Sequence, residues 1–579
     1  MRFSAYLIIY VLISAMNLLP TGAMSKTLDF SILHTNDLHS AVTGTGPDAY
    51  FTSAAGDGDP VSGHYARLAH EIKSQREALE TQGKEVLLLD GGDFFAGSLF
   101  HVLTPRSDTP FSPELEFLKI LNYDAVTIGN HEFDGGREGF LTMLTKNNQY
   151  FQVPLVSTNM HWDLLPAADR QLTQSQVKRW IVKEYLGTEG KPIRIGILGA
   201  LGVNAILVSA GNREGFQFDG FRDSDSREQA NELHQAIQLG VDHLKQQEGV
   251  DIVILVTHAG HPEDEAMATE IDGLDIIIAG HTHQAYRKLR RKNNVYIAQA
   301  GSNGGFLGKL SFQWTEGELK FTGDENNIII DINDKVPADT EMLKVIERWE
   351  KEVNNYQNGF GYASDTPIFY SKNTRKKSRA YGTKICSLLL SAMNKVALEN
   401  KIRSIDVYLS TLSLMRLGIV GNETQPIEYR FADVFRILPL GFDQKMNPGS
   451  PVVHFHLNKS DLRILIRFLE LYHLIQNKFI PSFSDSISYE IRSWGIPFLN
   501  RLKDLALNNK PYEEWPDLVH IATSQYFAKF IPKINGISRG LINITPRDAS
   551  GQEIKEPKIF LNQKEYQLLS KALSEKKIF

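Results

Sequence analysis

The sequence predicts an α/β protein of two domains, in which a layered α/β domain precedes a smaller mixed α+β domain. The first observation is length, because 579 residues at roughly 100 to 200 per domain imply two or three domains. The second is that short apolar runs alternate with longer polar helical stretches over about residues 28–335. The third is an amphipathic segment that follows this region, where a domain boundary is expected.

The apolar runs of the first domain predict its strands. Several are continuous rather than alternating, as expected of strands that are covered on both faces by helices or by a second sheet. Polar segments between them, such as 64–80 and 227–247, have helical character. The predicted strands are 28–33, 86–89, 125–128, 155–157, 193–198, 251–256, 275–278 and 295–298.

The segment 338–357 predicts a linker helix between the domains. Met342, Ile346, Trp349 and Val353 fall on one stripe of such a helix, together with Val345. We therefore divide the chain into a first domain (26–337), a linker (338–360) and a second domain (361–579). The second domain has further predicted helices at 383–399 and 459–474.

The first 25 residues read as a signal peptide. Arg2 precedes an apolar run at 5–16, which Pro20 and the small residues 21–23 follow. The run is shorter than the roughly 20 residues that span a bilayer, so a transmembrane anchor fits less well. The other alternative is a buried N-terminal strand or helix. We expect an exported protein, periplasmic or secreted, without a stable membrane anchor.

Composition excludes several kinds of site. The 62 Lys and Arg residues against 68 Asp and Glu give a formal charge of -6, so no global basic field is available to hold a nucleic acid polymer. Cys386 is the single cysteine, which rules out an intramolecular disulfide and a thiolate-rich zinc site. His, Asp and Glu remain as the main metal ligands, and the chain has 17 histidines.

Polar residues follow the predicted strands in five blocks. In an open α/β sheet the loops at the carboxyl ends of strands converge on one crevice, so residues far apart in sequence can meet there. A single such histidine is more often a hydrogen-bonded loop residue than a ligand, but five blocks in this context favour a metal site. The blocks are His34-Thr-Asn-Asp-Leu-His39, Asp90-Gly-Gly-Asp93, Gly129-Asn-His-Glu-Phe-Asp134, Thr257-His-Ala-Gly260 and Gly280-His-Thr-His283.

These blocks resemble the 5'-nucleotidase and UDP-sugar hydrolase branch of the calcineurin-like metallophosphoesterase superfamily. The resemblance implies an αββα sandwich, in which two β layers are flanked by helices, and two divalent metal ions. It assigns one ion to Asp37, His39, Asp93 and His283, and the other to Asp93, Asn130, His258 and His281. Such ligands suit Zn, Mn, Fe or Co rather than Ca.

The resemblance also implies a catalytic pair, His131 and Asp134. In the family the histidine acts on the leaving group or on the developing negative charge, and the acidic residue orients it. The alternative role for Asp134 is that of a helix N-cap before Gly135 and Gly136. We expect His261 to be a loop residue and His34 to be structural.

The second domain matches the family more loosely. Arg416 and Tyr526 stand at positions where the family binds its substrate, and Arg375 or Arg379 could supply a further contact, although a solvated basic face is an equally good interpretation of both. Glycines and aromatic residues of the family pattern are replaced: Leu412, Ser413 and Leu414 precede Arg416, Leu440 stands where the family has a phenylalanine, and Phe530-Ile-Pro-Lys533 follows Tyr526.

From these residues we expect a phosphoester hydrolase that acts on a small molecule, a nucleotide, and releases nucleoside and phosphate. Two bound divalent ions and two ligand carboxylates would leave a net positive charge for a phosphate. The divergent second domain keeps two alternatives open. One is a hydrolase of the same fold with another substrate, such as a UDP-sugar, a 2',3'-cyclic nucleotide or a thiosulfate ester. The other is a secreted binding protein without activity.

Overall fold

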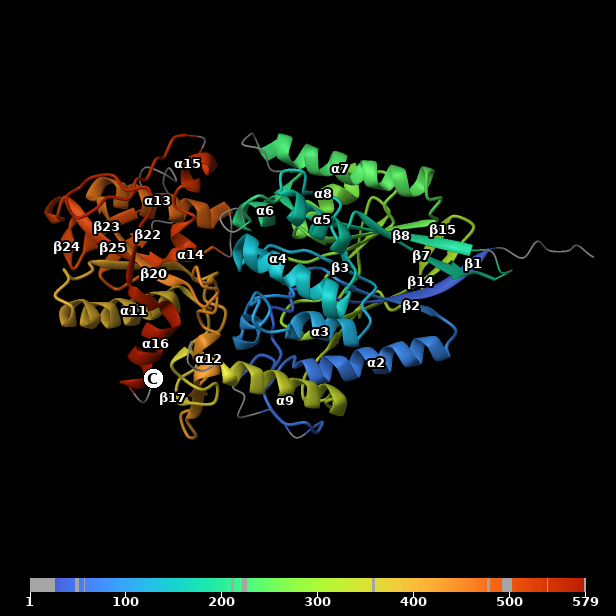
Figure 1. Ribbon diagram of the computed structural model, residues 1–579, viewed down its shortest axis with the longest axis horizontal. Helices are drawn as coiled ribbons and strands as arrows, with labels where there is room; N and C mark the ends of the chain where they lie inside the picture. Colours follow the sequence, from blue (N-terminus) through green and yellow to red (C-terminus); the bar gives the residue numbers. More distant parts are fainter. Residues whose placement is uncertain are drawn as a thin grey trace, which may run out of the picture.

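The computed structural model describes residues 26–576 apart from 47–50, 57, 189, 191, 210–212, 221–225, 357–359, 476–478, 492–501 and 539. The predicted signal peptide therefore lies outside the described residues. Figure 1 shows two lobes, an α/β lobe from the first part of the chain and a mixed lobe from the last part, so the predicted fold class is confirmed. In the part of the chain that the structure describes, no helix is both long and apolar enough to cross a membrane.

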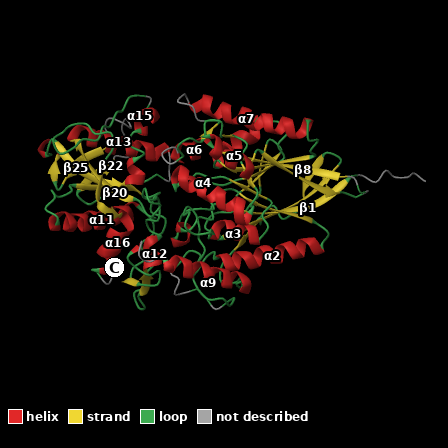
Figure 2. Ribbon diagram, viewed as in Figure 1, coloured by secondary structure: helices red, strands yellow, loops and turns green. Residues whose placement is uncertain are grey.

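Two β-sheets form the centre of the first lobe, and α7 (Ser226–Gln246) and α2 (Tyr65–Thr81) lie on opposite sides of them (Figures 1 and 2). Each of the eight predicted apolar runs coincides with a strand of these sheets, and four of them extend one residue beyond it. The first sheet has the order β15 (Glu318–Phe321), β14 (Phe306–Thr315), β1 (Thr27–Thr35), β2 (Glu85–Asp90), β3 (Ala125–Thr127), β4 (Leu155–Val156), β6 (Val177–Lys178), and β16 (Ile329–Asp331) pairs with β14. The second has the order β12 (Arg290–Lys292), β13 (Val295–Ala298), β11 (Ile276–Ile278), β10 (Ile252–His258), β8 (Pro192–Leu201), β7 (Trp180–Leu186).

The two sheets pack through one apolar cluster. Phe30 and Leu87 of the first sheet and Ile254 and Ile277 of the second belong to it, and all four are fully buried. This burial on both faces explains why the runs are continuous rather than alternating. Further helices cover the sandwich: α3 (Pro113–Ile120), α4 (Gly136–Lys146), α5 (Ala167–Gln176), α6 (Val203–Ser209) and α8 (His261–Glu270).

Parallel pairing brings the polar blocks to one edge of the sandwich. β1, β2 and β3 are parallel neighbours in the first sheet, and β10 and β11 are parallel neighbours in the second. Each of the five blocks begins at or just after the carboxyl end of one of these strands. The edge faces the second lobe.

The linker helix α9 (Thr340–Asn355) lies on the first lobe. It packs against α2 and against the short helix η2 (Leu99–Val102), and Asp339 caps it by accepting a hydrogen bond from the Met342 amide. Trp349 is fully buried and its indole donates to Glu116 Oε2 at 2.7 Å. The stripe expected from sequence is therefore the face that docks onto the first domain.

The second lobe contains a five-stranded sheet with helices packed around it. The sheet has the order β21 (Pro481–Phe483), β18 (Val407–Thr411), β25 (Leu518–Ser524), β20 (Pro451–Asn458), β26 (Lys558–Lys564). The helices are α11 (Arg379–Glu399), α12 (Phe431–Phe435), α13 (Lys459–Ile475), α14 (Gln525–Ala528), α15 (Lys533–Ile537) and α16 (Glu565–Ser574). Smaller sheets pair β17 (Pro367–Ser371) with β19 (Ile427–Arg430), and β22 (Ile487–Ile491) with β23 (Leu502–Leu507) and β24 (Lys510–Pro511).

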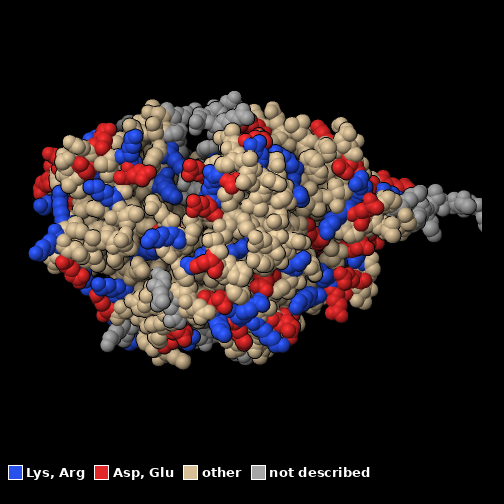
Figure 3. Space-filling view, viewed as in Figure 1, with Lys and Arg blue, Asp and Glu red and all other residues tan. Residues whose placement is uncertain are grey.

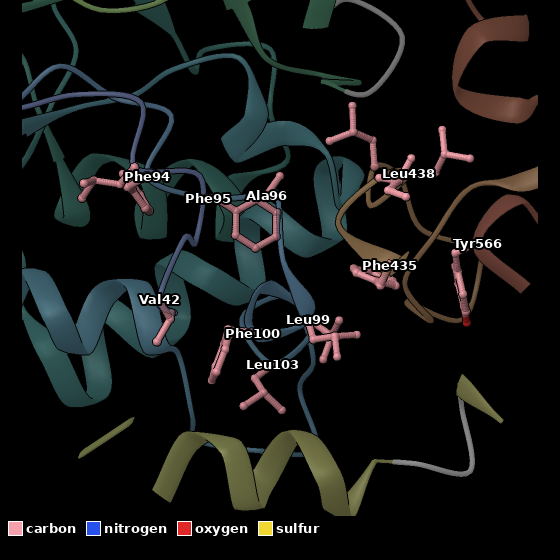
Figure 4. Close-up of a cluster of buried hydrophobic side chains, with 14 of the residues drawn as sticks. Val42, Phe94, Phe95, Ala96, Leu99, Phe100, Leu103, Phe435, Leu438 and Tyr566 are labelled. Carbon is pink, nitrogen blue, oxygen red and sulfur yellow. The ribbon is translucent and has the colours of Figure 1, made fainter. Parts of the chain in front are cut away.

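One hydrophobic cluster continues from the first lobe into the second (Figure 4). Phe95 and Leu99 of the first lobe belong to the same cluster as Phe435, Leu438 and Tyr566 of the second. This shared core fixes how the second lobe faces the edge that carries the polar blocks.

Candidate metal and phosphoester site

The seven predicted metal ligands converge where the sandwich faces the second lobe. His39 Nε2 lies 3.0 Å from His283 Nε2, and His283 Nε2 lies 3.2 Å from Asp37 Oδ1. On the other side, His258 Nε2 lies 3.0 Å from Asp93 Oδ2. Three groups of side chains have ligand atoms close enough together to hold an ion: Asp37 with His39 and His283, Asp93 with His258 and His281, and His39 with Asp93 and His131.

The backbone that carries these side chains is strained. Five of the seven predicted ligand residues have positive φ, with values from 48° to 75°. Non-glycine residues rarely adopt this conformation, and it persists where the surrounding structure enforces it, most often at functional sites. The five residues are Asp37, His39, Asp93, His281 and His283.

Glycines allow the loops to come this close. A Cβ on Gly129 would lie 2.2 Å from Asp93 Oδ1, and one on Gly280 would lie 2.4 Å from the carbonyl oxygen of Gly91. No side chain fits at either position, so the glycines of these blocks are required by the approach of one loop to the next.

The buried carboxylates create a negative field that favours cations. Burial opposes ionisation of Asp93, but nearby histidines, His258 foremost, outweigh it and hold the pKa of Asp93 well below its usual value. Burial likewise opposes a charge on His258, yet the Asp93 carboxylate raises the pKa of His258 to about 10. A cation in this pocket is thus stabilised by the two carboxylates of Asp37 and Asp93.

The donor set fits divalent ions. Imidazole nitrogens of His39 and His283 point at each other at 3.0 Å, an arrangement expected of two ligands that share one ion. Asn130 Oδ1 is buried and has no hydrogen-bond partner among the described residues, as expected of an oxygen kept for a metal. These nitrogen and oxygen donors therefore fit a divalent metal ion.

Glu132 organises the site, a role the sequence analysis did not assign. Its buried carboxylate accepts hydrogen bonds from the backbone N–H groups of Asp93 (3.1 Å), Phe95 (3.0 Å) and Gly129 (2.6 Å). It thereby joins the loop after β2 to the loop after β3. The sequence signal for this role is an acidic residue between Asn130 and Asp134, inside one of the five polar blocks.

Two asparagines support ligands from outside the predicted set. Asn36 donates to Asp37 Oδ2 at 2.7 Å and to the Gly301 carbonyl at 2.7 Å. Asn204 Oδ1 lies 2.9 Å from His281 Nε2, which leaves Nδ1 of that ring for a metal. Asn36 stands beside a ligand in sequence, whereas Asn204 comes from α6 and only the tertiary structure brings it here.

His131 and Asp134 form the predicted pair geometrically. His131 Nδ1 donates to Asp134 Oδ2 at 2.7 Å, and the His131 amide donates to Asp93 Oδ1 at 2.8 Å. Gly135 is the N-cap of α4, so Asp134 does not take the alternative role of capping this helix. Asp134 therefore serves to orient His131.

Two residues of the second lobe reach this pair. A guanidinium nitrogen of Arg416 donates to His131 Nε2, and the Tyr526 hydroxyl donates to Asp134 Oδ1 at 2.9 Å. Burial raises the pKa of the Tyr526 phenol well above its usual value, and the Asp134 carboxylate raises it further, so Tyr526 remains a donor. Tyr526 thus contacts Asp134 through its hydroxyl, and the substrate contacts expected of Arg416 and Tyr526 stay predictions.

The other two predicted substrate arginines lie differently. Arg379 pairs with Glu470 through two guanidinium nitrogens and also donates to Tyr489 Oη at 3.1 Å. Arg375 is exposed and its backbone pairs with Ile419. Neither side chain lines the cavity beside the ligands.

The aromatic positions of the second domain are used for packing. Leu440 is buried, and Phe442 stacks on Phe95 with ring centroids 6.1 Å apart and contacts His101 edge-on at 5.3 Å. Phe442 thus belongs to the contact between the lobes.

Two other histidines behave as expected or nearly so. His34 is fully buried in β1, and burial lowers the pKa of its ring to about 3, in keeping with a structural residue. His261 is the first residue of α8 rather than a loop residue, and its ring contacts Arg290.

Comparison with known proteins now adds to this geometry. Residues 30–285 match the family of calcineurin-like phosphoesterases. The chain is 26% identical to the 5'-nucleotidase of Bos taurus over 467 residues, which cover 75% of this chain and 73% of that protein. It is 24% identical over 392 residues to the trifunctional nucleotide phosphoesterase YfkN of Bacillus subtilis, but this match spans 64% of the chain and about a quarter (24%) of YfkN.

The crystal structure of a 5'-nucleotidase precursor from Thermus thermophilus has the same fold, with a TM-score of 0.69 and 17% identity over 96% of this chain and 97% of that one. The first lobe is thus a calcineurin-like phosphoesterase domain, that is, a domain of metal-dependent phosphoester hydrolases. Within that class, the chain is similar to 5'-nucleotidases over about three quarters of its length.

Proposed function

We propose that this protein is an exported phosphoesterase that holds two divalent ions and hydrolyses nucleotides to nucleoside and phosphate. The observation that carries the proposal is the contact between the lobes, in which Arg416 and Tyr526 meet the His131–Asp134 pair beside the converged ligands. The relatives named above are nucleotidases and a nucleotide phosphoesterase, which supports this substrate class.

One ion would be held by Asp37, His39, Asp93 and His283, and the other by Asp93, Asn130, His258 and His281. When bound, such ions activate water and neutralise the charge of a phosphoester. Asp93 lies between the two groups, with Oδ2 near His258 Nε2 and Oδ1 accepting the His131 amide. This hydrogen bond from the His131 backbone amide fixes Asp93 relative to the proposed catalytic pair.

His131 would handle the proton or charge of the leaving group. Asp134 accepts from Nδ1 of the ring and therefore directs Nε2 outward. In the present geometry Nε2 accepts from Arg416, so a substrate oxygen must replace this contact before His131 can donate to it. Arg416 is then free to bind the phosphoester oxygens, which its planar guanidinium suits.

A hydrolase of this fold with another substrate is the second candidate. It is favoured by the positions of Leu440, which is aliphatic, and Phe442, which packs on Phe95 and His101. A nucleobase that is held between two aromatic side chains needs a free face on each of them. A UDP-sugar, a 2',3'-cyclic nucleotide or a thiosulfate ester would then be the substrate.

The test is substrate profiling with the metal content measured. Purified protein is loaded with Mn or Zn and assayed on nucleoside monophosphates, UDP-sugars, cyclic nucleotides, thiosulfate esters and p-nitrophenyl phosphate. We expect metal-dependent release of phosphate from a nucleotide. If metal is bound and none of these substrates turns over, the protein is not a hydrolase and the binding-protein alternative stands.

A further inference from the structure

A basic cavity of about 70 Å³ lies between the lobes beside the metal ligands. Its lining includes His39 and His283 from the first lobe and three basic residues, Lys377, Arg416 and Arg436, from the second. Among the described residues, no Asp or Glu lines it. Elsewhere, on the face shown in Figure 3, acidic and basic side chains are interspersed, so this concentration of one sign of charge is local.

Arg436 is placed in this cavity at a cost. It directly follows α12 and is 6% exposed. One of its guanidinium nitrogens donates a hydrogen bond to the carbonyl oxygen of Gly44. Its Nη1 atom is buried and has no hydrogen-bond partner among the described residues. A buried guanidinium that is only partly paired is destabilising, unless a ligand supplies the missing acceptor.

Arg416 shows the same deficit. Its Nε atom is also buried without a partner among the described residues, while another of its nitrogens contacts His131. Two unsatisfied guanidinium groups in one cavity call for a ligand with several acceptor oxygens, such as a carboxylate or a phosphate. Lys377 is exposed and adds a further positive charge at the rim.

The cavity extends from two of the predicted metal ligands to Arg436 of the second lobe. His39 and His283 line the cavity on one side, and both are assigned to the same metal ion. Arg436 enters from the opposite lobe and is anchored to Gly44 rather than to a metal ligand. An acidic group bound to Arg436 would therefore belong to the part of the substrate next to the scissile phosphate.

We propose that this cavity binds a second anionic group of the substrate, with Arg436 as its central residue. The preferred substrates are then compact phosphoesters whose leaving group itself carries a carboxylate or a further phosphate. This inference rests on the proposed hydrolytic function and deepens it. The positive charge of Arg436 would select the substrate in place of a pair of aromatic rings that hold a nucleobase. Leu440 and Phe442, which offer no free pair of aromatic faces, agree with it.

The experiment compares substrates that differ in one group. Glycerol 3-phosphate has a hydroxymethyl group where 3-phosphoglycerate has a carboxylate, and AMP and ADP differ by one phosphate. The metal-loaded wild-type protein should have a kcat/KM at least about tenfold higher for the acidic member of one pair, as a charge-assisted hydrogen bond provides. The pair that shows the preference identifies whether the second group is a carboxylate or a phosphate.

Three variants assign the preference to the cavity. Arg436→Met should lower the ratio of the two kcat/KM values about tenfold, and Arg436→Lys should restore part of it. Lys377→Ala changes an exposed residue, cannot disturb the core, and should lower the ratio less. The matched control is Arg403→Ala, an exposed arginine of the second lobe that is 3.8 Å from Asp406, which should leave the ratio unchanged.

No preference in either pair, or an equal loss on both members in Arg436→Met, overturns the proposal. If the wild-type protein with metal bound turns over neither these four compounds nor any substrate of the wider panel above, the hydrolytic function fails, and the anion site is judged by calorimetric binding of inorganic pyrophosphate. An approximately tenfold weaker binding in Arg436→Met, with an unchanged melting temperature, then supports the site, and equal binding refutes it.

Discussion

The metal half and the substrate half of the site are built differently. The predicted ligands Asp37, Asp93 and Asn130 follow three parallel neighbouring strands of one sheet, so strand pairing brings them together. Arg416 and Tyr526 come from a separate lobe and arrive through packing between lobes. Local sequence order can therefore specify a cluster of metal ligands, whereas substrate contacts depend on how two domains dock.

The largest effect is expected from the shared ligand. Asp93→Asn removes the charge that both proposed ion sites use, so metal binding should weaken and kcat/KM should fall roughly 10⁴-fold, about 5 kcal/mol of transition-state stabilisation. Metal content by mass spectrometry and turnover check this. Asp29→Asn, at an exposed position of β1, is the control, and full metal content with full activity in Asp93→Asn would refute a shared ligand.

The interface between the halves is tested by its buried phenylalanine. Phe435→Ala removes a fully buried ring from the cluster that both lobes share, and should cost about 3–5 kcal/mol of unfolding free energy. Because the cluster is continuous, we expect both lobes to lose stability in denaturant unfolding followed by probes in each.

Leu465→Ala is the matched comparison, since Leu465 is equally buried but lies in a cluster confined to the second lobe. It should destabilise that lobe alone. The same response from both variants would mean that the shared core does not couple the lobes.

The catalytic pair should separate chemistry from metal binding. His131→Ala should lower kcat about 10²- to 10³-fold while metal content stays at the wild-type level, because general acid–base catalysis contributes this much. The loss should be smaller for p-nitrophenyl phosphate, whose leaving group needs little protonation. His261→Ala is the control, and an equal loss on all substrates would argue against a general acid.

A smaller effect is expected when the loops that carry the metal ligands lose a hydrogen-bond acceptor. Glu132→Gln leaves fewer acceptors for the three backbone donors of Asp93, Phe95 and Gly129, so we expect metal affinity to fall about 10- to 100-fold. Titration calorimetry of Mn or Zn measures it. Glu138→Gln, exposed on α4, should bind metal like the wild type; unchanged affinity in Glu132→Gln would show that the loops hold without it.

The smallest effect is expected on the substrate side. Tyr526→Phe removes one hydrogen bond to Asp134, worth about 1 kcal/mol, so kcat should fall about fivefold with metal affinity unchanged. Tyr370→Phe removes a similar tyrosine–carboxylate bond, to Glu428, at the exposed surface and should not alter kcat. A drop in metal affinity for Tyr526→Phe would break the division into two halves.

Much of the first lobe was predictable because its signals are local. Continuous short apolar runs such as 252–256 favour strands covered on both faces, and the polar blocks after them indicate the edge where the site lies. The stripe of Trp349 and its neighbours likewise predicted α9 to within two residues at each end.

Other features had no local signal. Asn204 reaches His281 from a helix 77 residues away, and the sequence around Arg379 does not indicate that its side chain pairs with Glu470. Arg436 is followed by an ordinary apolar segment, and nothing in its neighbourhood marks it as a residue of the cavity. Such roles depend on partners that are distant in sequence.

The sequence by itself determined an α/β domain of buried strands and the order of the polar blocks that follow them, because strand burial and the convergence of strand ends follow from hydrophobic pattern and from parallel pairing. Only the tertiary structure decided that Arg416 and Tyr526 meet the His131–Asp134 pair, and that Arg436 enters a cavity beside His39 and His283. The physical reason is that the shared core around Phe435 sets the docking of the lobes, and its contacts join residues more than 300 positions apart.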